Sequence, residues 1–238
     1  MPNPKEGEEL LREASKLGCA RAMYILGWCL MEGKYGVPQN ETEAEQWLLQ
    51  AIDHEYSNAM LYLGWRYIDG AGVEKNTEKG KQLLQKAIEF GNLDAMAELG
   101  SRLMDGAGLK QDLLRGEELL RLGIEQNDAE CMYELGWRIL DGRVPGGDLV
   151  EGEQLLRKAA ELGSLDAETE LGWCLIKGTT QVPDPVEGEE ILRRACEGGS
   201  CRAMYLLGWC LMEGAYGITK NEAEAEQWLL KAVDQGYT

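Results

Sequence analysis

The chain is built from a unit of about 36 residues that recurs along its length. Residues 21–56 align without a gap to residues 202–237, and 26 of the 36 positions are identical. Four looser copies lie between them. The glycine of a Leu-Gly pair marks the six copies at spacings of 37, 36, 36, 36 and 36 residues: Gly27, Gly64, Gly100, Gly136, Gly172 and Gly208. A fixed period of this length is typical of a helical-repeat solenoid, in which each unit packs on its neighbours.

Each unit predicts two helices, which we call A and B. Helix A contains the Leu-Gly pair, and helix B follows a short glycine-rich turn. Every predicted B helix is preceded by Asn or Asp, which cap helix N-termini well: Asn3, Asn40, Asn76, Asp112, Asp148, Asp184 and Asn221. At several of these sites a Glu three residues later can complete a capping box: Glu6, Glu43, Glu151, Glu187 and Glu224.

The ends of the B helices are equally regular. Glycine follows most of them, in the place of a left-handed C-cap: Gly18, Gly91, Gly163, Gly199 and Gly236. Asn127 takes this place once, and Glu55 takes it after the B helix that ends near residue 53. We therefore expect the turn at Glu55 to differ from the other turns. Gly or Ala inside the helices, such as Gly27 and Ala44, predicts points where helices approach closely.

The pattern predicts an all-α chain of six A helices and seven B helices in a single repeat domain, residues 1–238. Residues 1–18 are expected to form an N-terminal capping helix. The helix-turn-helix repeats cover approximately residues 19–56, 57–92, 93–128, 129–164, 165–200 and 201–238.

These residues resemble a known family. An Ala, the Leu-Gly pair, a further Gly six residues later, a Gly-Val-type turn and an Ala-x-x-Trp/Leu-x-x-x-Ala second helix resemble the Sel-one-like repeat, a relative of the tetratricopeptide repeats. The resemblance covers nearly the whole chain. It implies a right-handed α/α solenoid superhelix with A helices along its concave side, and a non-enzymatic role as a scaffold or adaptor for other proteins. Ser101 in place of Trp and the Pro-Gly-Gly turn at 145–147 depart from the pattern.

Composition narrows the class of partner. The chain has 42 acidic and 24 basic residues and a net charge of −18. This charge disfavours binding to nucleic acids and anionic membranes and favours a basic protein or peptide, although solubility alone also accounts for it. Cys29, Cys174 and Cys210 share one repeat position, which indicates small apolar filler and not a disulfide framework or a metal site. The N-terminus lacks the apolar core of a secretory signal, so we expect a cytoplasmic protein.

A row of large rings lies outside the predicted core. On a helical wheel the residue after the motif Gly lies about 160° from the core Leu, and tryptophan holds this position in five repeats: Trp28, Trp65, Trp137, Trp173 and Trp209. Tyr24, Tyr133 and Tyr205 lie one turn earlier on the same flank. Two interpretations stay open. Neighbouring A helices bury these rings between them, or the rings line a groove and anchor a partner.

The same flank carries 11 acidic residues: Glu32, Asp69, Asp94, Glu98, Asp105, Glu130, Glu134, Asp141, Asp166, Glu170 and Glu213. Together these features predict an acidic, Trp- and Tyr-lined concave groove that binds a basic protein or peptide. The predicted contact residues are Tyr24, Trp28, Trp65, Asp69, Glu98, Asp105, Tyr133, Glu134, Trp137, Asp141, Trp173, Tyr205 and Trp209. Recent duplication explains the near-identical ends, and so does a second possibility, that Tyr24 and Tyr205 belong to two equivalent contact surfaces.

No catalytic constellation is recognisable. The one histidine, His54, lies at a predicted helix end without a neighbouring nucleophile. We predict no enzymatic activity, no metal and no cofactor. An alternative function is a cytoplasmic immunity or inhibitor protein that neutralises a cationic toxin such as a nuclease, because acids can occupy a basic active site. The sequence leaves the identity of the partner and the oligomeric state open.

Overall fold

A computed structural model of the chain describes residues 4–237, so the predicted cap Asn3 lies outside the described residues. These residues form thirteen α-helices and one 3₁₀ turn, η1 (Ala215–Gly217). The B helices are α1 (Pro4–Lys16), α3 (Glu41–Asp53), α5 (Thr77–Glu89), α7 (Leu113–Glu125), α9 (Leu149–Glu161), α11 (Pro185–Glu197) and α13 (Glu222–Asp234). The A helices are α2 (Ala20–Glu32), α4 (Ser57–Asp69), α6 (Leu93–Asp105), α8 (Ala129–Leu140), α10 (Leu165–Lys177) and α12 (Cys201–Glu213). The predicted all-α repeat fold is confirmed.

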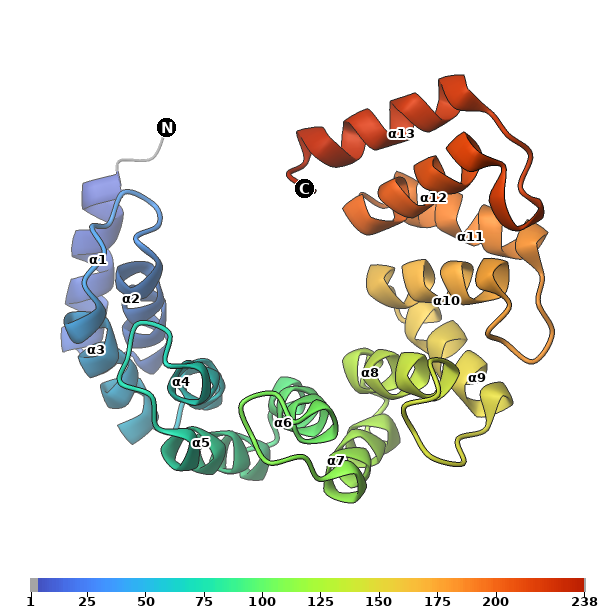
Figure 1. The fold of residues 1–238 in the computed structure, drawn as a ribbon. Helices are drawn as coiled ribbons and strands as arrows, with labels where there is room; N and C mark the ends of the chain where they lie inside the picture. Colours follow the sequence, from blue (N-terminus) through green and yellow to red (C-terminus); the bar gives the residue numbers. More distant parts are fainter. Residues whose placement is uncertain (1–3, 238) are drawn as a thin grey trace. The chain divides into compact units, whose positions relative to one another are not determined.

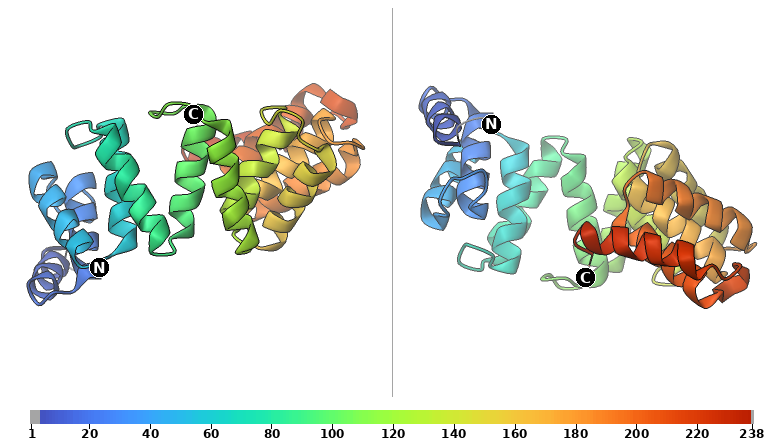
Figure 2. Two further views of the ribbon diagram at one scale, coloured as in Figure 1. Left: turned by 90° about the horizontal axis from the view of Figure 1, so that it is seen from below. Right: turned by 90° about the horizontal axis from the view of Figure 1, so that it is seen from above.

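The chain divides into two compact units, Met1–Leu119 and Leu120–Thr238. Within each unit an A helix packs most extensively on the B helix that follows it, as α4 packs on α5 and α10 on α11. Figures 1 and 2 show these pairs as antiparallel helices joined by short turns. Consecutive pairs also touch, since α10 contacts α8, α9 and α12. Each unit therefore has a layer of A helices and a layer of B helices.

The core lies between the two layers. The Leu that precedes each motif Gly is at most 2% exposed: Leu26, Leu63, Leu99, Leu135, Leu171 and Leu207. In α2 the residues predicted to face the core are all buried: Ala22, Met23, Leu26, Leu30 and Met31. Burying one such Leu or Met contributes about 1.5–3 kcal/mol relative to an exposed side chain. The 3.6-residue periodicity of the sequence therefore identifies this face of the A helices correctly.

Glycine brings the two helices of a pair into backbone contact. A Cβ built on Gly80 of α5 would lie 2.5 Å from the carbonyl oxygen of Gly64 in α4. A Cβ on Gly188 of α11 would likewise lie 2.7 Å from the carbonyl oxygen of Gly172 in α10. These distances leave no room for a methyl group. The predicted close approach at the small residues is confirmed, and it sets the separation of each helix pair.

The caps of the B helices follow the sequence pattern with one difference. Side chains of Asn40, Asn76 and Asn221 accept hydrogen bonds from backbone N–H groups of the first helical turn. The expected capping box does not close at Asn40, because its own N–H already donates to the carbonyl of Leu30, at 2.9 Å. The carboxylate of Glu43 accepts instead from the Asn40 amide, the Trp47 indole and Arg12. The acid thus links B helices α1 and α3.

The turn at Glu55 has the same backbone form as its counterparts, so the expectation of a different turn is wrong. Glu55 has φ = 61°, in the left-handed region occupied by Gly91 (74°) and Gly163 (93°) at equivalent sites. The N–H of Glu55 still donates to Ile52, and that of Tyr56 to Ala51. The repeat geometry therefore imposes a left-handed conformation on a side chain that disfavours it.

We predict that Gly80→Ala destabilises the chain. The methyl group gains about 1 kcal/mol in helix propensity, but separating two backbones that touch costs about 1–3 kcal/mol. Gly7 occupies the same position of α1, and a Cβ there meets nothing within 4 Å. The matched Gly7→Ala variant should therefore gain stability. Urea unfolding of both variants measures the difference, and equal effects at the two sites would contradict the close-approach account.

We also predict that Glu55→Gly stabilises the chain by about 1 kcal/mol, because it removes the left-handed strain of a non-glycine residue. Asn127 has φ = 62° at the equivalent site, and asparagine tolerates this region better. Asn127→Gly should therefore gain less. Thermal unfolding compares the two, and a loss of stability in Glu55→Gly would show that the side chain makes a compensating contact.

Candidate functional site

The tryptophans of the A helices are partly buried, which is compatible with both interpretations of these rings. Each ring packs against a neighbour of its own unit and keeps part of its surface exposed. Trp28 lies 5.8 Å from Tyr35 between ring centroids, and Trp65 lies 5.3 Å from Tyr62. Trp173 contacts Trp209 at 6.1 Å. Such rings support the fold and can also present a face to a ligand.

Most of the acids on this flank already hold an arginine. At least six of the 11 form ion pairs with one: Glu32 with Arg66, Asp69 and Glu98 with Arg102, Glu134 with Arg138, Asp141 with Arg143, and Glu170 with Arg202. Asp105 is exposed at the end of α6. A helical wheel places Arg66, Arg102 and Arg138 at the edge of this flank and does not show these pairs. It missed the pairing because an arginine side chain is long enough to reach across to an acid on the next element.

Three of these arginines, Arg66, Arg102 and Arg202, tie one A helix to the preceding one. Arg66 and Arg102 stand two residues after the motif Gly, and we call each of these two an arginine rung. Arg66 of α4 donates to Glu32 at the end of α2, to the Tyr62 hydroxyl at 2.8 Å and to the Ala71 carbonyl at 3.1 Å. Its guanidinium carbon lies 4.4 Å from the centroid of the Trp65 ring. A carboxylate, a hydroxyl, a carbonyl and a ring thus surround one buried guanidinium, whose two terminal nitrogens are hydrogen-bonded. Its buried Nε has no hydrogen-bond partner.

The second rung repeats this arrangement in α6. Arg102 forms a bidentate pair with Asp69 at the end of α4, with N–O distances of 2.7 and 2.8 Å. It also donates to Glu98 and, at 3.5 Å, to the Ala107 carbonyl. Hydrogen bonds from Arg102 hold the pKa of Asp69 below its ordinary value. The hydrogen bond from Tyr62, followed by the charge of Arg66, does the same for Glu32.

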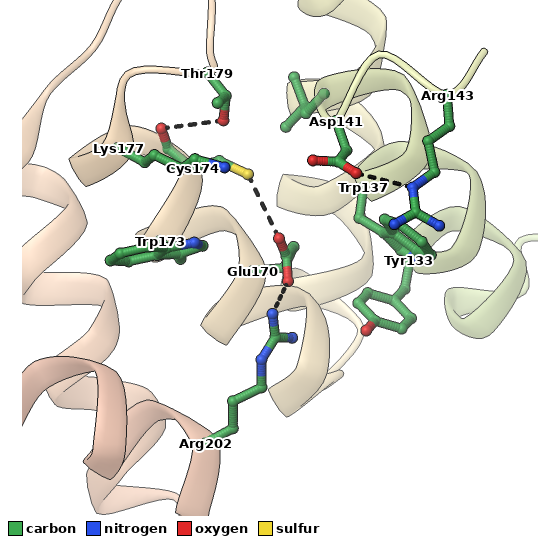
Figure 3. A pocket seen from close by; sticks show the side chains of 11 residues that line it. Tyr133, Trp137, Asp141, Arg143, Glu170, Trp173, Cys174, Lys177, Thr179 and Arg202 are labelled. Atoms are coloured by element: carbon green, nitrogen blue, oxygen red, sulfur yellow. Dashed lines mark hydrogen bonds and ion pairs between the residues drawn. The ribbon is translucent and has the colours of Figure 1, made fainter.

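The second unit contains a pocket of about 370 Å³ on its A layer (Figure 3). It brings together four of the predicted contact residues, and its lining comes from α8, α10, α12 and the adjoining turns. The lining residues are Tyr133, Trp137, Leu140, Asp141, Arg143, Glu170, Trp173, Cys174, Lys177, Thr179 and Arg202. Asp141, the fourth predicted contact residue there, completes the set together with Tyr133, Trp137 and Trp173. Sequence reasoning named these four as contact residues, and it did not identify Arg143 beside them.

Burial and charge determine what this pocket can do chemically. Burial raises the pKa of the Cys174 thiol to about 12 and that of Tyr133 to about 12. Both groups therefore stay protonated and neutral at physiological pH, and Cys174 is not an activated nucleophile. Asp141 Oδ2 accepts from Arg143 at 2.8 Å, and Glu170 Oε2 lies 2.5 Å from Arg202. The pocket is thus suited to binding through rings and paired charges.

Tyr24 and Tyr205, the predicted contact residues of the two near-identical repeats, each pack on the tyrosine that ends their own repeat, Tyr56 or Tyr237. Tyr24 contacts the rings of Tyr56 and Tyr62 at 5.3 and 6.2 Å, so the following repeat covers it. Tyr205 contacts Tyr237 at 5.2 Å and is 42% exposed. The added contact with Tyr62 is the difference between the two tyrosines, and a shared binding role for them stays a prediction.

The described residues show no arrangement that points to metal chemistry. Within residues 4–237 no group of three or more His, Cys, Asp and Glu side chains is placed to hold a metal ion. His54 is exposed at the end of α3. All seven cysteines, which lie in this part of the chain, are free thiols. Five of them are buried as predicted for filler, whereas Cys19 is exposed and Cys201 is partly exposed. No helix among the described residues has the length and apolarity needed to cross a membrane.

Helix pairs of this length and packing define an α/α repeat protein. The Sel1 repeat family matches the chain seven times, at residues 1–19, 20–56, 57–92, 93–128, 129–164, 165–200 and 201–237, and the chain belongs to this family. Sel1 repeat proteins generally mediate protein–protein interactions and are typically scaffolds without catalytic activity. No curated protein matches the chain.

Solved structures show the same fold. A Sel1 repeat protein from Oxalobacter formigenes is 25% identical, with a TM-score of 0.76 over 98% of this chain and 100% of that one. A sel1 repeat protein from Klebsiella pneumoniae is 21% identical, with a TM-score of 0.54 over 80% of this chain and 92% of that one. A protective antigen of uropathogenic Escherichia coli strains is also 21% identical, with a TM-score of 0.51 over 96% of this chain and 64% of that one.

The arginine rung gives a prediction for stability against pH. Because the folded pKa of Asp69 is lowered, its contribution is complete above the unfolded pKa of about 3.9 and is lost as pH falls through the folded value. Asp69→Asn should therefore cost about 1 kcal/mol at pH 7 for this partly exposed pair and almost nothing at pH 2. Urea unfolding at both pH values measures this. Glu74→Gln, which removes an exposed charge from the turn after α4, should show no such pH dependence.

Proposed function

We propose that this chain is a non-enzymatic interaction module that binds a basic protein or peptide through the A layer of its second unit. The observation that carries the proposal is the pocket that α8, α10 and α12 build around Trp137 and Trp173. Both indoles are partly exposed and come from successive repeats. Tryptophan, tyrosine and arginine dominate the energetics of protein interfaces, and all three line this pocket.

The basic character of the partner rests on long-range charge. The net charge of −18 attracts a cationic partner and accelerates its encounter. Local contacts to most predicted acids are already taken, since Asp69, Glu98, Glu134 and Asp141 hold arginines of the same chain. We therefore assign the acids mainly to steering and the rings of the pocket mainly to affinity. The proposal keeps the reducing cytoplasm as the location, which the seven free thiols support.

The alternative of an immunity protein requires the same basic partner but a different outcome, namely loss of the partner's activity. The net charge supports it equally, and none of the described residues favours it over an adaptor. Co-expression with candidate cationic toxins separates the two functions, because only an inhibitor restores growth.

A defined peptide library tests the proposal. Peptides selected on the purified chain from a phage-displayed random library should be basic, and their affinity should fall at least about tenfold in Trp137→Ala and in Trp173→Ala. Trp228 of the B layer, whose indole donates to Glu224 at 3.3 Å, provides the matched control. Trp228→Ala also removes a partly buried indole but should leave affinity within about twofold. Calorimetry measures affinity, and circular dichroism confirms that each variant is folded.

The salt dependence of the binding rates distinguishes long-range electrostatic attraction from direct contact. Raising the ionic strength from about 0.05 to 0.5 M shortens the screening distance to about 4 Å, so the association rate should fall several-fold while the dissociation rate changes little. Surface plasmon resonance with the selected peptide resolves the two rates. Unchanged binding by both pocket variants, or selection of acidic peptides, would overturn the proposed function.

A further inference from the structure

The fifth repeat departs from a pattern that the three preceding repeats share. At the position two residues after the motif Gly, the helices α4, α6 and α8 carry Arg66, Arg102 and Arg138. The helix α10 carries Cys174 at this position. The pocket of the second unit is lined by this cysteine. A short thiol therefore stands where an arginine rung fills the corresponding space between α2 and α4 and between α4 and α6.

The surroundings of the rung are nevertheless retained. Around Arg66 lie an acid at the end of the preceding A helix, a polar side chain four residues earlier, a ring directly before it and a carbonyl five residues later. In the fifth repeat these positions are held by Asp141, Glu170, Trp173 and Thr179. All four residues line the pocket, and Figure 3 shows Asp141 and Glu170 on either side of it.

The other two cysteines at this position provide an internal comparison. Cys210 of α12 has Leu206 four residues earlier and Lys177 at the end of the preceding A helix. Cys29 of α2 has Ile25 four residues earlier. Neither therefore combines a missing arginine with two carboxylates. Among the three repeats with cysteine here, only the fifth has acids at both positions that hold Arg102 in the third repeat.

We propose that this pocket binds the guanidinium group of an arginine side chain from the partner, which completes the missing rung. The inference rests on the proposed function, since it names the chemistry that the pocket recognises in a basic partner. The guanidinium bridges Asp141 and Glu170 and stacks on Trp173, as Arg66 stacks on Trp65 at 4.4 Å. An arginine suits this role because its planar, five-donor fork satisfies two carboxylates and a ring face together.

The acceptor oxygens of the pocket are incompletely used. Asp141 engages Arg143 through Oδ2, and Glu170 engages Arg202 through Oε2. The other oxygen of Glu170, Oε1, accepts from the Cys174 thiol at 3.7 Å. A thiol is a weak donor, so a guanidinium N–H is a better partner for this oxygen. Both carboxylates keep their intramolecular pairs while they accept the added donors.

Three basic side chains also line the pocket. They could bind an acidic ligand, which is the competing possibility. Arg143 and Arg202 are each held by a carboxylate. Lys177 is exposed at the C-terminal end of α10, and its long side chain can turn its ammonium toward water. We therefore expect Lys177 to weaken arginine binding slightly. If the ligand were a carboxylate, Lys177 would instead strengthen its binding. Removing the Lys177 charge should therefore raise the affinity for an arginine ligand and lower the affinity for an acidic one.

The first measurement compares matched peptides. Acetyl-Gly-Arg-Gly amide, its Lys analogue and its Glu analogue are titrated into the full chain while NMR follows the indole N–H of Trp173. The Arg peptide should bind saturably and at least about fivefold more tightly than the Lys peptide, because an ammonium cannot make the planar contacts. Lys177→Gln should strengthen this binding by up to about twofold. Preference for the Glu peptide, or weaker Arg binding in Lys177→Gln, would overturn the inference in favour of an acidic ligand.

The second measurement introduces an arginine of the chain itself at the position of Cys174. Cys174→Arg should weaken binding of the Arg peptide at least about tenfold, because its own guanidinium occupies the site. It should also unfold at a higher temperature than the parent chain. Cys174→Ser keeps the pocket open, and its affinity for the Arg peptide should stay within about twofold of the parent chain. Glu170→Gln, which keeps shape and removes charge, gives an independent reading should Cys174→Arg fail to fold, and it should weaken binding about tenfold. Normal binding by Glu170→Gln would contradict the inference.

The two proposals fail in different ways. If the selected basic peptides lose affinity in Trp137→Ala and Trp173→Ala while the Arg tripeptide shows no saturable shift, the interaction module stands and the guanidinium site is wrong. If the selected peptides bind Trp137→Ala and Trp173→Ala with unchanged affinity, the proposed function is wrong, regardless of whether the Arg tripeptide binds.

Discussion

The backbone contact between the two helices of a repeat is the constraint on which the other features depend. Where the carbonyl of Gly64 meets Gly80, the added Cβ distance of 2.5 Å leaves no room for a larger residue. The contact fixes the spacing and rotation of each helix pair, so equivalent positions of successive repeats lie in equivalent surroundings. A ring, an acid or an arginine at one repeat position then meets the same neighbours in the next repeat. The arginine rungs and the pocket beside Cys174 both follow from this regularity.

The fold was predictable because its determinants are local and periodic. The Leu-Gly spacing, the Asn and Asp caps and the C-terminal glycines each act within one or two helical turns, and each recurs in the sequence. Glu55 shows the limit of this reasoning. Its identity suggested a different turn, yet the neighbouring helices impose φ = 61°. Tertiary packing overrides the local preference of one residue when the flanking helices are already positioned.

The positions of the rings and of Asp141 were predictable, whereas the ion pairs between charged residues were not. A helical wheel places Trp137 and Trp173 on the pocket side of their helices, because the backbone fixes the direction in which each side chain leaves the helix. It cannot show that Arg102 reaches back to Asp69 with N–O distances of 2.7 and 2.8 Å, since this contact joins two repeats. An alignment of the repeats with one another would have identified the site. It shows that Cys174 occupies the position of Arg66, Arg102 and Arg138, and that the fifth repeat has acids at the neighbouring positions but no arginine.

A crystal structure of the full chain with acetyl-Gly-Arg-Gly amide tests most directly whether the repeat frame that holds an internal arginine also holds an external one. The account predicts the peptide guanidinium between Asp141 and Glu170, with N–O distances of about 2.7–3.0 Å and its plane on the Trp173 ring, in the place that Arg66 takes in the second repeat. A peptide bound by its backbone to Lys177 with the guanidinium in solvent, or bound on the B layer, would contradict it.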